Sequence, residues 1–187
     1  MSIKDEKMAL RSLLKQKRAE INIQDKQKAD QIICDKLLSL NEIKNAKTVL
    51  TFVSTKDEVD TICFIKSLFS LHKNVAVPKC IDINGNMSFY LISSLESLLE
   101  NSFGIFEPSD KSEKLQDFSN SVCIIPALSF DKNKQRIGYG KGYYDRFLKE
   151  YKGIKIGICY DELITQKLPC DSFDISADKV ITQTQIF

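Results

Sequence analysis

The stretch Arg136-Ile-Gly-Tyr-Gly-Lys-Gly-Tyr-Tyr-Asp145 links an apolar run, 122–126, to a segment with helical character, 143–151. Its glycines alternate at positions 138, 140 and 142. Alternating glycines permit positive φ angles and let a ligand approach the main chain closely. Successive main-chain amides can then form a concave anion site, which the N-terminus of the following helix reinforces. The stretch therefore predicts a strand-to-helix turn that binds an anion, and Arg136 and Lys141 add positive charge suited to phosphate oxygens.

This pattern differs from the common nucleotide-binding motifs. It contains no G-x-x-x-x-G-K-[ST], and Tyr143 occupies the slot of the third glycine of a dinucleotide fingerprint. A plain strand-to-helix turn is the alternative interpretation, and the neighbouring arginine, lysine, tyrosines and aspartate argue against it. Asp145 falls in the first turn of the predicted helix. It either complements the helix dipole or binds magnesium beside phosphate groups, and the residues alone leave both interpretations open.

The alternation of strands and helices indicates the fold class. Expected helices cover 2–20, 24–40, 60–72, 95–99 and 143–151, and expected strands cover 48–53, 75–78, 87–92, 122–126, 155–160 and 180–182. Asn84-Gly85 suggests a hairpin, whereas 103–114 and 169–178 are predicted to be loops. The order predicts an α/β fold with a mostly parallel sheet and helices on both faces. The length fits a single domain over residues 1–187.

The first two predicted helices have candidate buried faces. The first has its apolar side chains at Met8, Leu10, Leu13, Leu14 and Ile21, opposite a basic face. The second has inward positions Ala29, Ile32, Ile33, Leu37 and Leu40. Parallel sheets place ligands at the carboxyl ends of their strands. Polar clusters follow predicted strands at 54–60, 131–145 and 161–162, so we expect the site there.

Composition excludes several classes of protein. A net charge of +2 argues against a gross electrostatic binder of nucleic acid. No apolar run approaches the roughly 20 residues that span a bilayer, and the N-terminus lacks the apolar core of a signal peptide. We therefore expect a cytoplasmic protein with neither a membrane nor a nucleic-acid partner.

Cysteine and histidine content restricts the chemistry further. The six cysteines form no C-x-x-C pair, so buried free thiols are expected rather than a disulfide framework or a zinc site. The single histidine, His72, is expected at the surface. Carboxylates, lysines and main-chain amides are left to act on a substrate, because a histidine base or a histidine-rich metal site would depend on that one residue.

Four segments, in order, resemble one family. Ile124-Ile-Pro-Ala-Leu-Ser-Phe-Asp131 followed by 136–147 resembles the signature of 5-formyltetrahydrofolate cyclo-ligase, also called methenyltetrahydrofolate synthetase. Lys7-Met-Ala-Leu-Arg11 resembles its K-x-x-L-R opening. The segment 52–60, with its Asp-Glu pair, and Gly104-Ile-Phe-Glu-Pro108 are similar to two further family segments. The matches span nearly the whole chain, and the long glycine-tyrosine motif is the specific one.

The resemblance implies a reaction and a fold. The enzyme, a ligase that forms a C–N bond, would convert 5-formyltetrahydrofolate and ATP to 5,10-methenyltetrahydrofolate, ADP and phosphate, with Mg²⁺. The fold would be a three-layer α/β/α arrangement like that of the ribose-phosphate isomerase and CoA-transferase group. Phosphoryl transfer to the formyl oxygen requires mainly positioning and charge neutralisation, which suits a chain with one histidine.

The resemblance also implies roles for individual residues. ATP would contact Lys7, Met8, Ala9, Leu10, Arg11, Arg136, Ile137, Gly138, Tyr139, Gly140, Lys141, Gly142, Tyr143 and Tyr144. The folate, with or without a polyglutamate tail, would contact Val53, Glu58, Phe103, Tyr139, Gly140, Lys141, Gly142 and Tyr143. The catalytic group would comprise Lys141, Arg136 and Tyr143. Magnesium would bind Asp145 and Asp174, with Asp171 and Asp178 as alternatives to Asp174.

For some of these residues, a purely structural role is the alternative interpretation. Glu58 either bonds the donor edge of the pterin or is a surface carboxylate beside Lys56, and Phe103 either stacks on the pterin or packs in the core. Lys132, Lys134 and Lys155 either meet a polyglutamate tail or are solvated, and the solvated surface is favoured.

Two other functions compete with the cyclo-ligase. One is a sugar-phosphate isomerase or acyl transferase of the same fold group, which would not use ATP. The other is a nucleotide- or RNA-binding module based on the basic first helix, which the near-neutral net charge disfavours. For the cyclo-ligase we expect a monomer.

Overall fold

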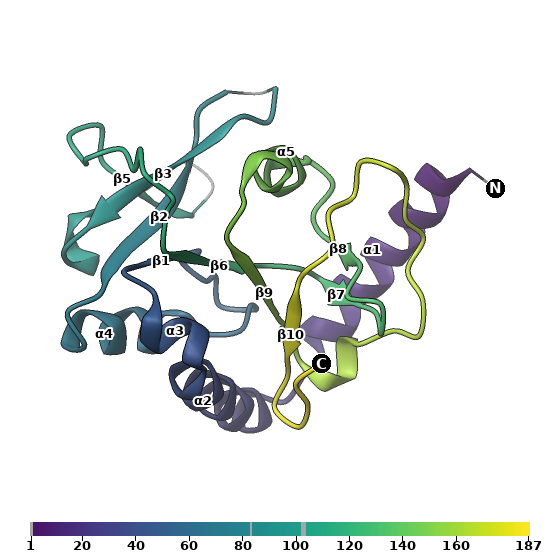
Figure 1. Ribbon diagram of the computed structural model, residues 1–187. Helices are drawn as coiled ribbons and strands as arrows, with labels where there is room; N and C mark the ends of the chain where they lie inside the picture. The colour runs from purple at the N-terminus through teal and green to yellow at the C-terminus, as the bar shows by residue number, and fades with distance from the viewer. Residues whose placement is uncertain (1, 83, 102–103) are drawn as a thin grey trace.

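A six-stranded sheet forms the centre of the protein, whose computed structural model describes residues 2–82, 84–101 and 104–187 (Figure 1). The strand order is β10-β9-β6-β1-β2-β3. Its members are β1 (Thr48–Leu50), β2 (Asn74–Cys80), β3 (Met87–Ile92), β6 (Ser121–Ile125), β9 (Ile154–Ile158) and β10 (Lys179–Ile181). All neighbouring pairs are parallel except β2 with β3, which form the hairpin predicted around Asn84-Gly85. The prediction of a mostly parallel sheet is confirmed.

Helices cover both faces of this sheet. Figure 1 shows α2 (Ile23–Ser39), α3 (Asn41–Asn45) and α4 (Ile62–Ser70) on one face and α5 (Tyr143–Glu150) on the other. Because both faces are covered, the central strands consist of buried residues throughout: every residue of β1 and β6 is buried. The predicted three-layer α/β/α arrangement is therefore confirmed.

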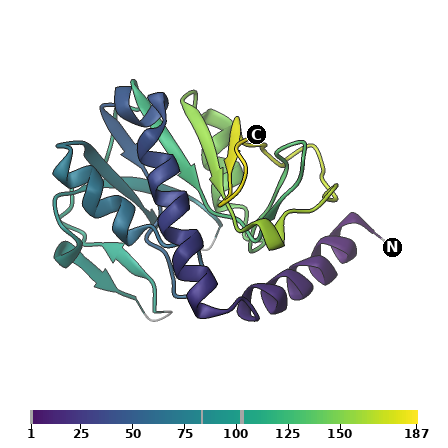
Figure 2. The ribbon, with the colours of Figure 1, turned by 90° about the horizontal axis from the view of Figure 1, so that it is seen from below.

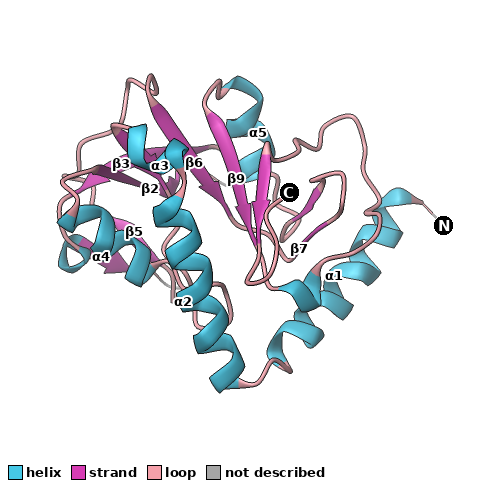
Figure 3. Ribbon diagram, turned by 60° about the horizontal axis from the view of Figure 1, so that its bottom comes forward, coloured by secondary structure: helices cyan, strands magenta, loops and turns pink. Residues whose placement is uncertain are grey.

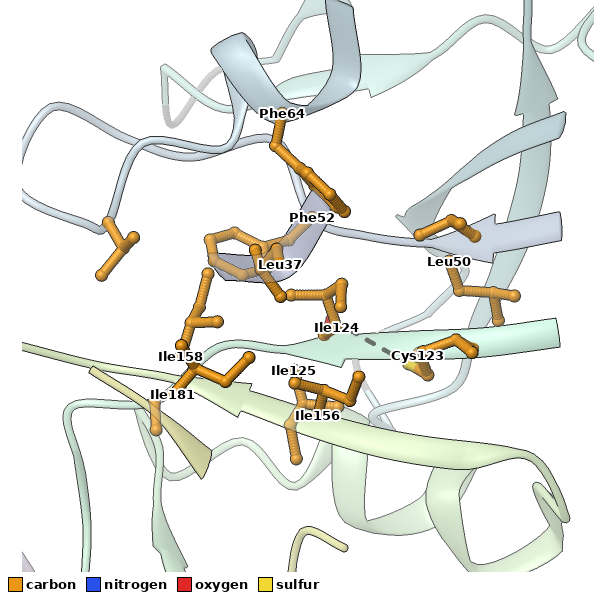
Figure 4. Close-up of a cluster of buried hydrophobic side chains, with 14 of the residues drawn as sticks. Leu37, Leu50, Phe52, Phe64, Cys123, Ile124, Ile125, Ile156, Ile158 and Ile181 are labelled. Atoms are coloured by element: carbon orange, nitrogen blue, oxygen red, sulfur yellow. Dashed lines mark hydrogen bonds between the residues drawn. The ribbon is translucent and has the colours of Figure 1, made fainter. Parts of the chain in front are cut away.

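The core lies between the sheet and the α2–α4 layer. Figure 4 shows Leu37 of α2 and Phe64 of α4 directed toward Phe52 and Ile124 of the sheet region, and all four are at most 6% exposed. On the α5 side, the ring of Phe130 packs on Gly157, where a Cβ atom would lie 2.3 Å from the ring. Burial of such side chains contributes most of the folding free energy.

The helix α1 (Ile3–Ala19) lies apart from these layers. Figures 2 and 3 show it leading away from α2 and lying beyond the β7 end of the molecule. A capping box formed by Ser2 and Asp5 fixes its N-terminus. The predicted apolar face is wrong in part: Met8 and Leu13 are 62% and 48% exposed, whereas Leu14 and, unexpectedly, Lys7 are buried. The apolar pattern failed because α1 does not lie on the sheet and its contacts are largely polar.

Short elements account for most of the remaining corrections. The predicted helix 95–99 is a 3₁₀ turn, η1 (Leu95–Ser97), followed by β4 (Leu98–Glu100). The predicted loop 103–114 contains β5 (Phe106–Pro108), which pairs with β4 in a separate ribbon. A second ribbon pairs β7 (Ser129–Phe130) with β8 (Arg136–Ile137), and η2 (Asp161–Leu163) follows β9. Short strands that pair with another short segment leave little local pattern, so sequence reasoning missed them.

Exposure differs from prediction at a few more positions. Ile32, expected to face inward on α2, is 42% exposed. Cys34, Cys123 and Cys159 are buried as predicted, but Cys63, Cys80 and Cys170 are exposed; all six are free thiols. His72 is exposed, as expected. Within the described ranges, no helix combines the length and apolar character needed to cross a bilayer.

Candidate functional site

A cavity of about 630 Å³ lies where the C-terminal part of β2 and the segments that follow β1 and β6 meet the glycine-rich turn. Side chains reach it from α1, from the loop after β1 and from residues 136–145. The predicted site residues that line it are Lys7, Arg11, Val53, Glu58, Arg136, Ile137, Gly138, Tyr139, Gly140, Lys141, Gly142, Tyr143, Tyr144, Asp145 and Asp174. The cavity is thus at the carboxyl ends of parallel strands, where the fold class places ligands.

A few predicted contacts lie elsewhere. Met8, Ala9 and Leu10 share α1 with Lys7 and Arg11 but do not line the cavity. Phe103 lies outside the described residues. Of the lysines considered for a polyglutamate tail, Lys132 and Lys134 bond to Gln185 Oε1 and to the Asp178 carbonyl, and none of the three lines the cavity.

Local geometry shapes the glycine-rich turn. Gly140 and Gly142 have φ angles of +94° and +72°, whereas Gly138 is not among the positive-φ residues. Gly142 is the N-cap of α5 and provides no capping side chain. The first amides of a helix lack intrahelical partners, so this N-terminus can bind an anion. Arg11 packs against this turn from α1, and its Nε donates to the Gly138 carbonyl at 3.0 Å.

The charges of Arg136 and Asp145 are paired at the wall of the cavity, whereas Lys141 is left without an ion-pair partner among the described residues. Arg136 donates to Asp145 Oδ1 at 2.6 Å, and the Arg136 side chain is only 6% exposed. Asp145 therefore has a specific cationic partner, beyond the helix dipole that it faces from the first turn. Lys141, by contrast, is exposed at the cavity and forms no ion pair with any described residue, which leaves its charge for a ligand.

Lys7 forms the second cluster of charges. Its Nζ lies 2.9 Å from Asp171 Oδ2 and 2.5 Å from Asp174 Oδ2. Burial opposes its charge, but the hydrogen bonds to the two aspartates outweigh that effect and raise the pKa of Lys7. Asp174 lines the cavity, whereas Asp171 does not, and Asp178 pairs instead with Lys155 at 2.8 Å. Geometry thus favours Asp174 among the three candidates for a metal ligand.

A third group surrounds Glu58, which is 8% exposed and so is not a surface carboxylate. The Tyr139 hydroxyl donates to Glu58 Oε1 at 2.9 Å and accepts from Arg18 Nη2 at 2.6 Å. Burial and the adjacent Glu58 charge raise the pKa of Tyr139 to about 12, so it stays a neutral donor. The Glu58 carboxylate is thereby held in place at the cavity wall.

Arg18 and Lys15 are site residues that sequence reasoning missed. Both line the cavity, and both lie over the Tyr139 ring, 5.5 Å and 5.6 Å from its centroid. Positions 7, 11, 15 and 18 share one face of a helix, and all four are basic. That periodicity, which the predicted apolar face obscured, is the signal that would have found them.

The tyrosines after Gly142 differ in their surroundings. Tyr143 donates to the Asp82 carbonyl at 2.9 Å and so connects α5 to the turn between β2 and β3. The Tyr144 hydroxyl is buried without a hydrogen-bond partner in the described parts of the protein. Burial raises the pKa of Tyr144 well above its ordinary value, so the hydroxyl stays neutral.

The carboxylates fit magnesium only together with a phosphate ligand. Among residues 2–82, 84–101 and 104–187, no cluster of three or more histidine, cysteine, aspartate or glutamate side chains could hold a metal ion. Asp145 and Asp174 line the same cavity, and the amide of Ile175 lies 3.4 Å from Asp145 Oδ1. Magnesium commonly binds one or two carboxylates plus phosphate oxygens and water, so the donor set suits it when a polyphosphate is bound.

A larger groove, of about 1150 Å³, lies beside α5. Phe118, Phe147 and Tyr151 contribute aromatic rings to it, and it contains none of the residues 136–145. Size alone does not identify a site; the smaller cavity has the convergent cations, carboxylates and main-chain amides.

Comparisons with known proteins agree with this geometry. Residues 3–183 match the model of the 5-formyltetrahydrofolate cyclo-ligase family. A Schizosaccharomyces pombe protein named "Probable 5-formyltetrahydrofolate cyclo-ligase" is 33% identical over 82% of this chain and 83% of its own length. The mouse 5-formyltetrahydrofolate cyclo-ligase is 28% identical over 97% of this chain and 95% of its own.

The solved structures give the same result. The Aquifex aeolicus 5,10-methenyltetrahydrofolate synthetase superposes with a TM-score of 0.86 at 30% identity, covering 96% of this chain and 91% of that one. Since the family model covers nearly the whole sequence and the fold agrees as well, this chain belongs to the 5-formyltetrahydrofolate cyclo-ligase family.

Proposed function

We propose that this protein catalyses the ATP- and Mg²⁺-dependent cyclisation of 5-formyltetrahydrofolate to 5,10-methenyltetrahydrofolate, with release of ADP and phosphate. One observation carries the proposal: the glycine-rich turn, the basic face of α1 and the buried carboxylate of Glu58 converge on one cavity. An anion site and an acceptor for N–H groups therefore lie side by side, as a reaction between a triphosphate and a folate requires.

The triphosphate would lie against the turn and the N-terminus of α5. The amides near Gly140 and Gly142 would bind phosphate oxygens, and Lys141 and Arg136 would neutralise the charge that develops during transfer. Lys7 and Arg11 would contact ATP from α1. Magnesium, held by Asp145 and Asp174 together with phosphate oxygens, would supply further charge neutralisation.

The folate would lie toward Glu58 and Val53. The Glu58 carboxylate would accept from the N–H edge of the pterin, with Tyr139 fixing its orientation. The formyl oxygen then attacks the γ-phosphorus, and the bond from phosphorus to the oxygen of ADP breaks. N10 attacks the activated formyl carbon, the C–O bond breaks to release phosphate, and N10 loses its proton. Tyr143, which bonds the Asp82 carbonyl, would support the geometry of the turn.

Monomeric state, polyglutamate binding and cytoplasmic location stay predictions. A single assay tests the proposed reaction. Purified protein is mixed with 5-formyltetrahydrofolate, Mg²⁺ and ATP, and the absorbance of 5,10-methenyltetrahydrofolate is followed. Product that depends on ATP is expected; product formed equally without nucleotide, or no product with any nucleoside triphosphate, would exclude the proposal and return the isomerase or acyl transferase to consideration.

Matched lysine variants test the role of the turn. Lys141 and Lys149 are both exposed, but only Lys141 lines the cavity. Lys141→Ala should reduce turnover by about 10²-fold or more, the range seen when a group that stabilises transition-state charge is removed. Lys149→Ala, which lies near the C-terminal end of α5, about two turns from the phosphate site, should retain full activity. Equal activity of the two variants would remove Lys141 from the mechanism.

A further inference from the structure

A buried polar network lies beneath the loop that presents Glu58, outside the residues assigned above. It joins α2, the loop at residues 54–61 and the end of β9. Its central members are Asp30, which is 9% exposed, and Tyr160, which is 1% exposed. A carboxylate and a phenol buried this far require partners, because an unpaired buried polar group costs free energy.

Asp30 bonds three segments at once. Its Oδ1 accepts from the amide of Asp60 at 3.0 Å and from the Tyr160 hydroxyl at 2.6 Å. Its Oδ2 accepts from Lys26 Nζ at 2.7 Å, and this cation offsets the burial of the Asp30 charge. The Asp30 carboxylate thus connects the loop at residues 54–61 to α2.

Tyr160 bonds to Glu58, the residue proposed above to bind the folate. Its hydroxyl shares one proton between Asp30 Oδ1 and the main-chain carbonyl of Glu58, which lies 3.0 Å away. Burial and the neighbouring Asp30 raise the pKa of Tyr160 far above its ordinary value, so the hydroxyl stays a donor. The main chain of Glu58 is therefore held directly, while Thr55 and Tyr139 hold its side chain.

The ends of the loop are closed by separate bonds. The amide of Ser54 donates to Thr61 Oγ1 at 3.0 Å, and the amide of Thr61 donates to Ser54 Oγ at 3.1 Å. The Thr61 hydroxyl donates to the Phe52 carbonyl at 2.7 Å. These bonds close the loop without Asp30. The bonds of Asp30 and Tyr160 therefore have a different effect, which is to fix the position of the Glu58 main chain at the cavity wall.

We propose that Asp30 and Tyr160 are positioning residues for the folate-binding carboxylate of Glu58, an inference that rests on the proposed function. They touch neither substrate; they act through the main chain of Glu58 and the amide of Asp60. Neither lines the cavity. Loss of either should weaken binding of the folate much more than binding of the phosphates, since Glu58 meets residues 136–145 through the Tyr139 hydroxyl.

The test compares the KM for 5-formyltetrahydrofolate with the KM for ATP in variants of Asp30 and Tyr160. Tyr160→Phe removes one hydroxyl and keeps the ring in place. We expect the KM for 5-formyltetrahydrofolate to rise by about tenfold, the effect of one misplaced hydrogen bond, with the KM for ATP and kcat changed by less than about twofold. Asp30→Asn, which retains an acceptor for Asp60, should give a smaller rise than Asp30→Ala.

A core variant provides the control for stability. Val180→Ala lies in β10, is fully buried and has no hydrogen bond to the loop, so it should lower the melting temperature without changing either KM. If Tyr160→Phe fails to fold, the Asp30 series gives the same readout. A melting temperature lowered with both KM values unchanged would mean that the network is only structural, and the inference would be wrong.

Failure of the positioning role can be distinguished from failure of the proposed function. If wild-type protein forms no methenyltetrahydrofolate, the proposed function fails and takes this inference with it. If Glu58→Gln raises the KM for the folate but folded Tyr160→Phe and Asp30→Ala do not, the function stands and the positioning role alone is excluded.

Discussion

Replacing Gly140 by alanine tests the geometry of the phosphate site most directly. Gly140 has a φ of +94°, a conformation that L-residues with a side chain seldom adopt. Holding alanine there costs about 1–3 kcal/mol of backbone strain. A Cβ atom would also lie 3.1 Å from Arg11 Cζ, so the guanidinium that bonds the Gly138 carbonyl would have to move.

The expected consequences follow from these two effects. For a domain of this size, each kcal/mol lowers the melting temperature by about 2–4 °C, so Gly140→Ala should melt about 2–12 °C below the wild type. Relief of the strain would reshape the turn and displace its amides. We therefore also expect the KM for ATP to rise by about tenfold or more, since one lost phosphate contact is worth about that much.

Gly138→Ala is the matched control, because Gly138 belongs to the same turn but lacks a positive φ. Its Cβ atom would meet only the end of the Arg136 side chain, at 3.0 Å. We expect its stability to stay within about 1 kcal/mol of the wild type. Scanning calorimetry and ATP titrations on both variants decide the matter. If Gly140→Ala is as stable and as active as the wild type, or if both variants suffer equally, the reasoning about the turn is refuted.

Further predictions concern ion pairing and burial. Lys7→Met removes the cation between Asp171 and Asp174. Asp171 is 40% exposed, but the side chains of Lys7 and Asp174 are only 9% and 16% exposed, so we expect a loss of about 1–3 kcal/mol at pH 7 in urea denaturation. The hydrogen bond from Lys7 lowers the pKa of Asp171 below its ordinary value of 3.8, so this stabilisation is present above that value and is lost as the pH falls through the lowered pKa. The deficit of Lys7→Met relative to the wild type should accordingly shrink below about pH 4, and a deficit that persists unchanged in acid would contradict the assignment. Tyr144→Phe removes a buried hydroxyl that has no partner among the described residues, and we expect unchanged or slightly increased stability, by up to about 1 kcal/mol; a clear loss would show that the hydroxyl is bonded.

Periodic and apolar patterns predicted most of the regular structure. Residues 121–125 form a strand because their run can be buried on both faces of a parallel sheet, and the same holds for the buried half of β9, residues 156–158. The helix after Gly142 was predicted from its own spacing and from the glycine that precedes it. Both are properties of a short window of sequence, which is why they could be read without knowledge of the rest of the chain.

Contacts between distant residues escaped the same reasoning. Lys7 was expected as an ATP contact on the basic face of the first helix, with a solvated position as the alternative, yet it is buried against Asp174, 167 positions away. Arg18 meets Tyr139 across 121 positions, and β4 pairs with β5, a segment that was predicted to be a loop. Such pairings depend on how whole elements pack, and no local periodicity records them.

From its sequence alone, this chain specified an α/β fold, a glycine-rich turn suited to phosphate and a family resemblance, because each depends on neighbouring residues or on ordered motifs. Only the tertiary structure decided that Glu58 is buried with its main-chain carbonyl bonded to Tyr160, and that Asp174 rather than Asp171 faces the cavity. The physical reason is that burial and hydrogen bonding at these positions are set by packing between elements, which the order of residues along one segment does not contain.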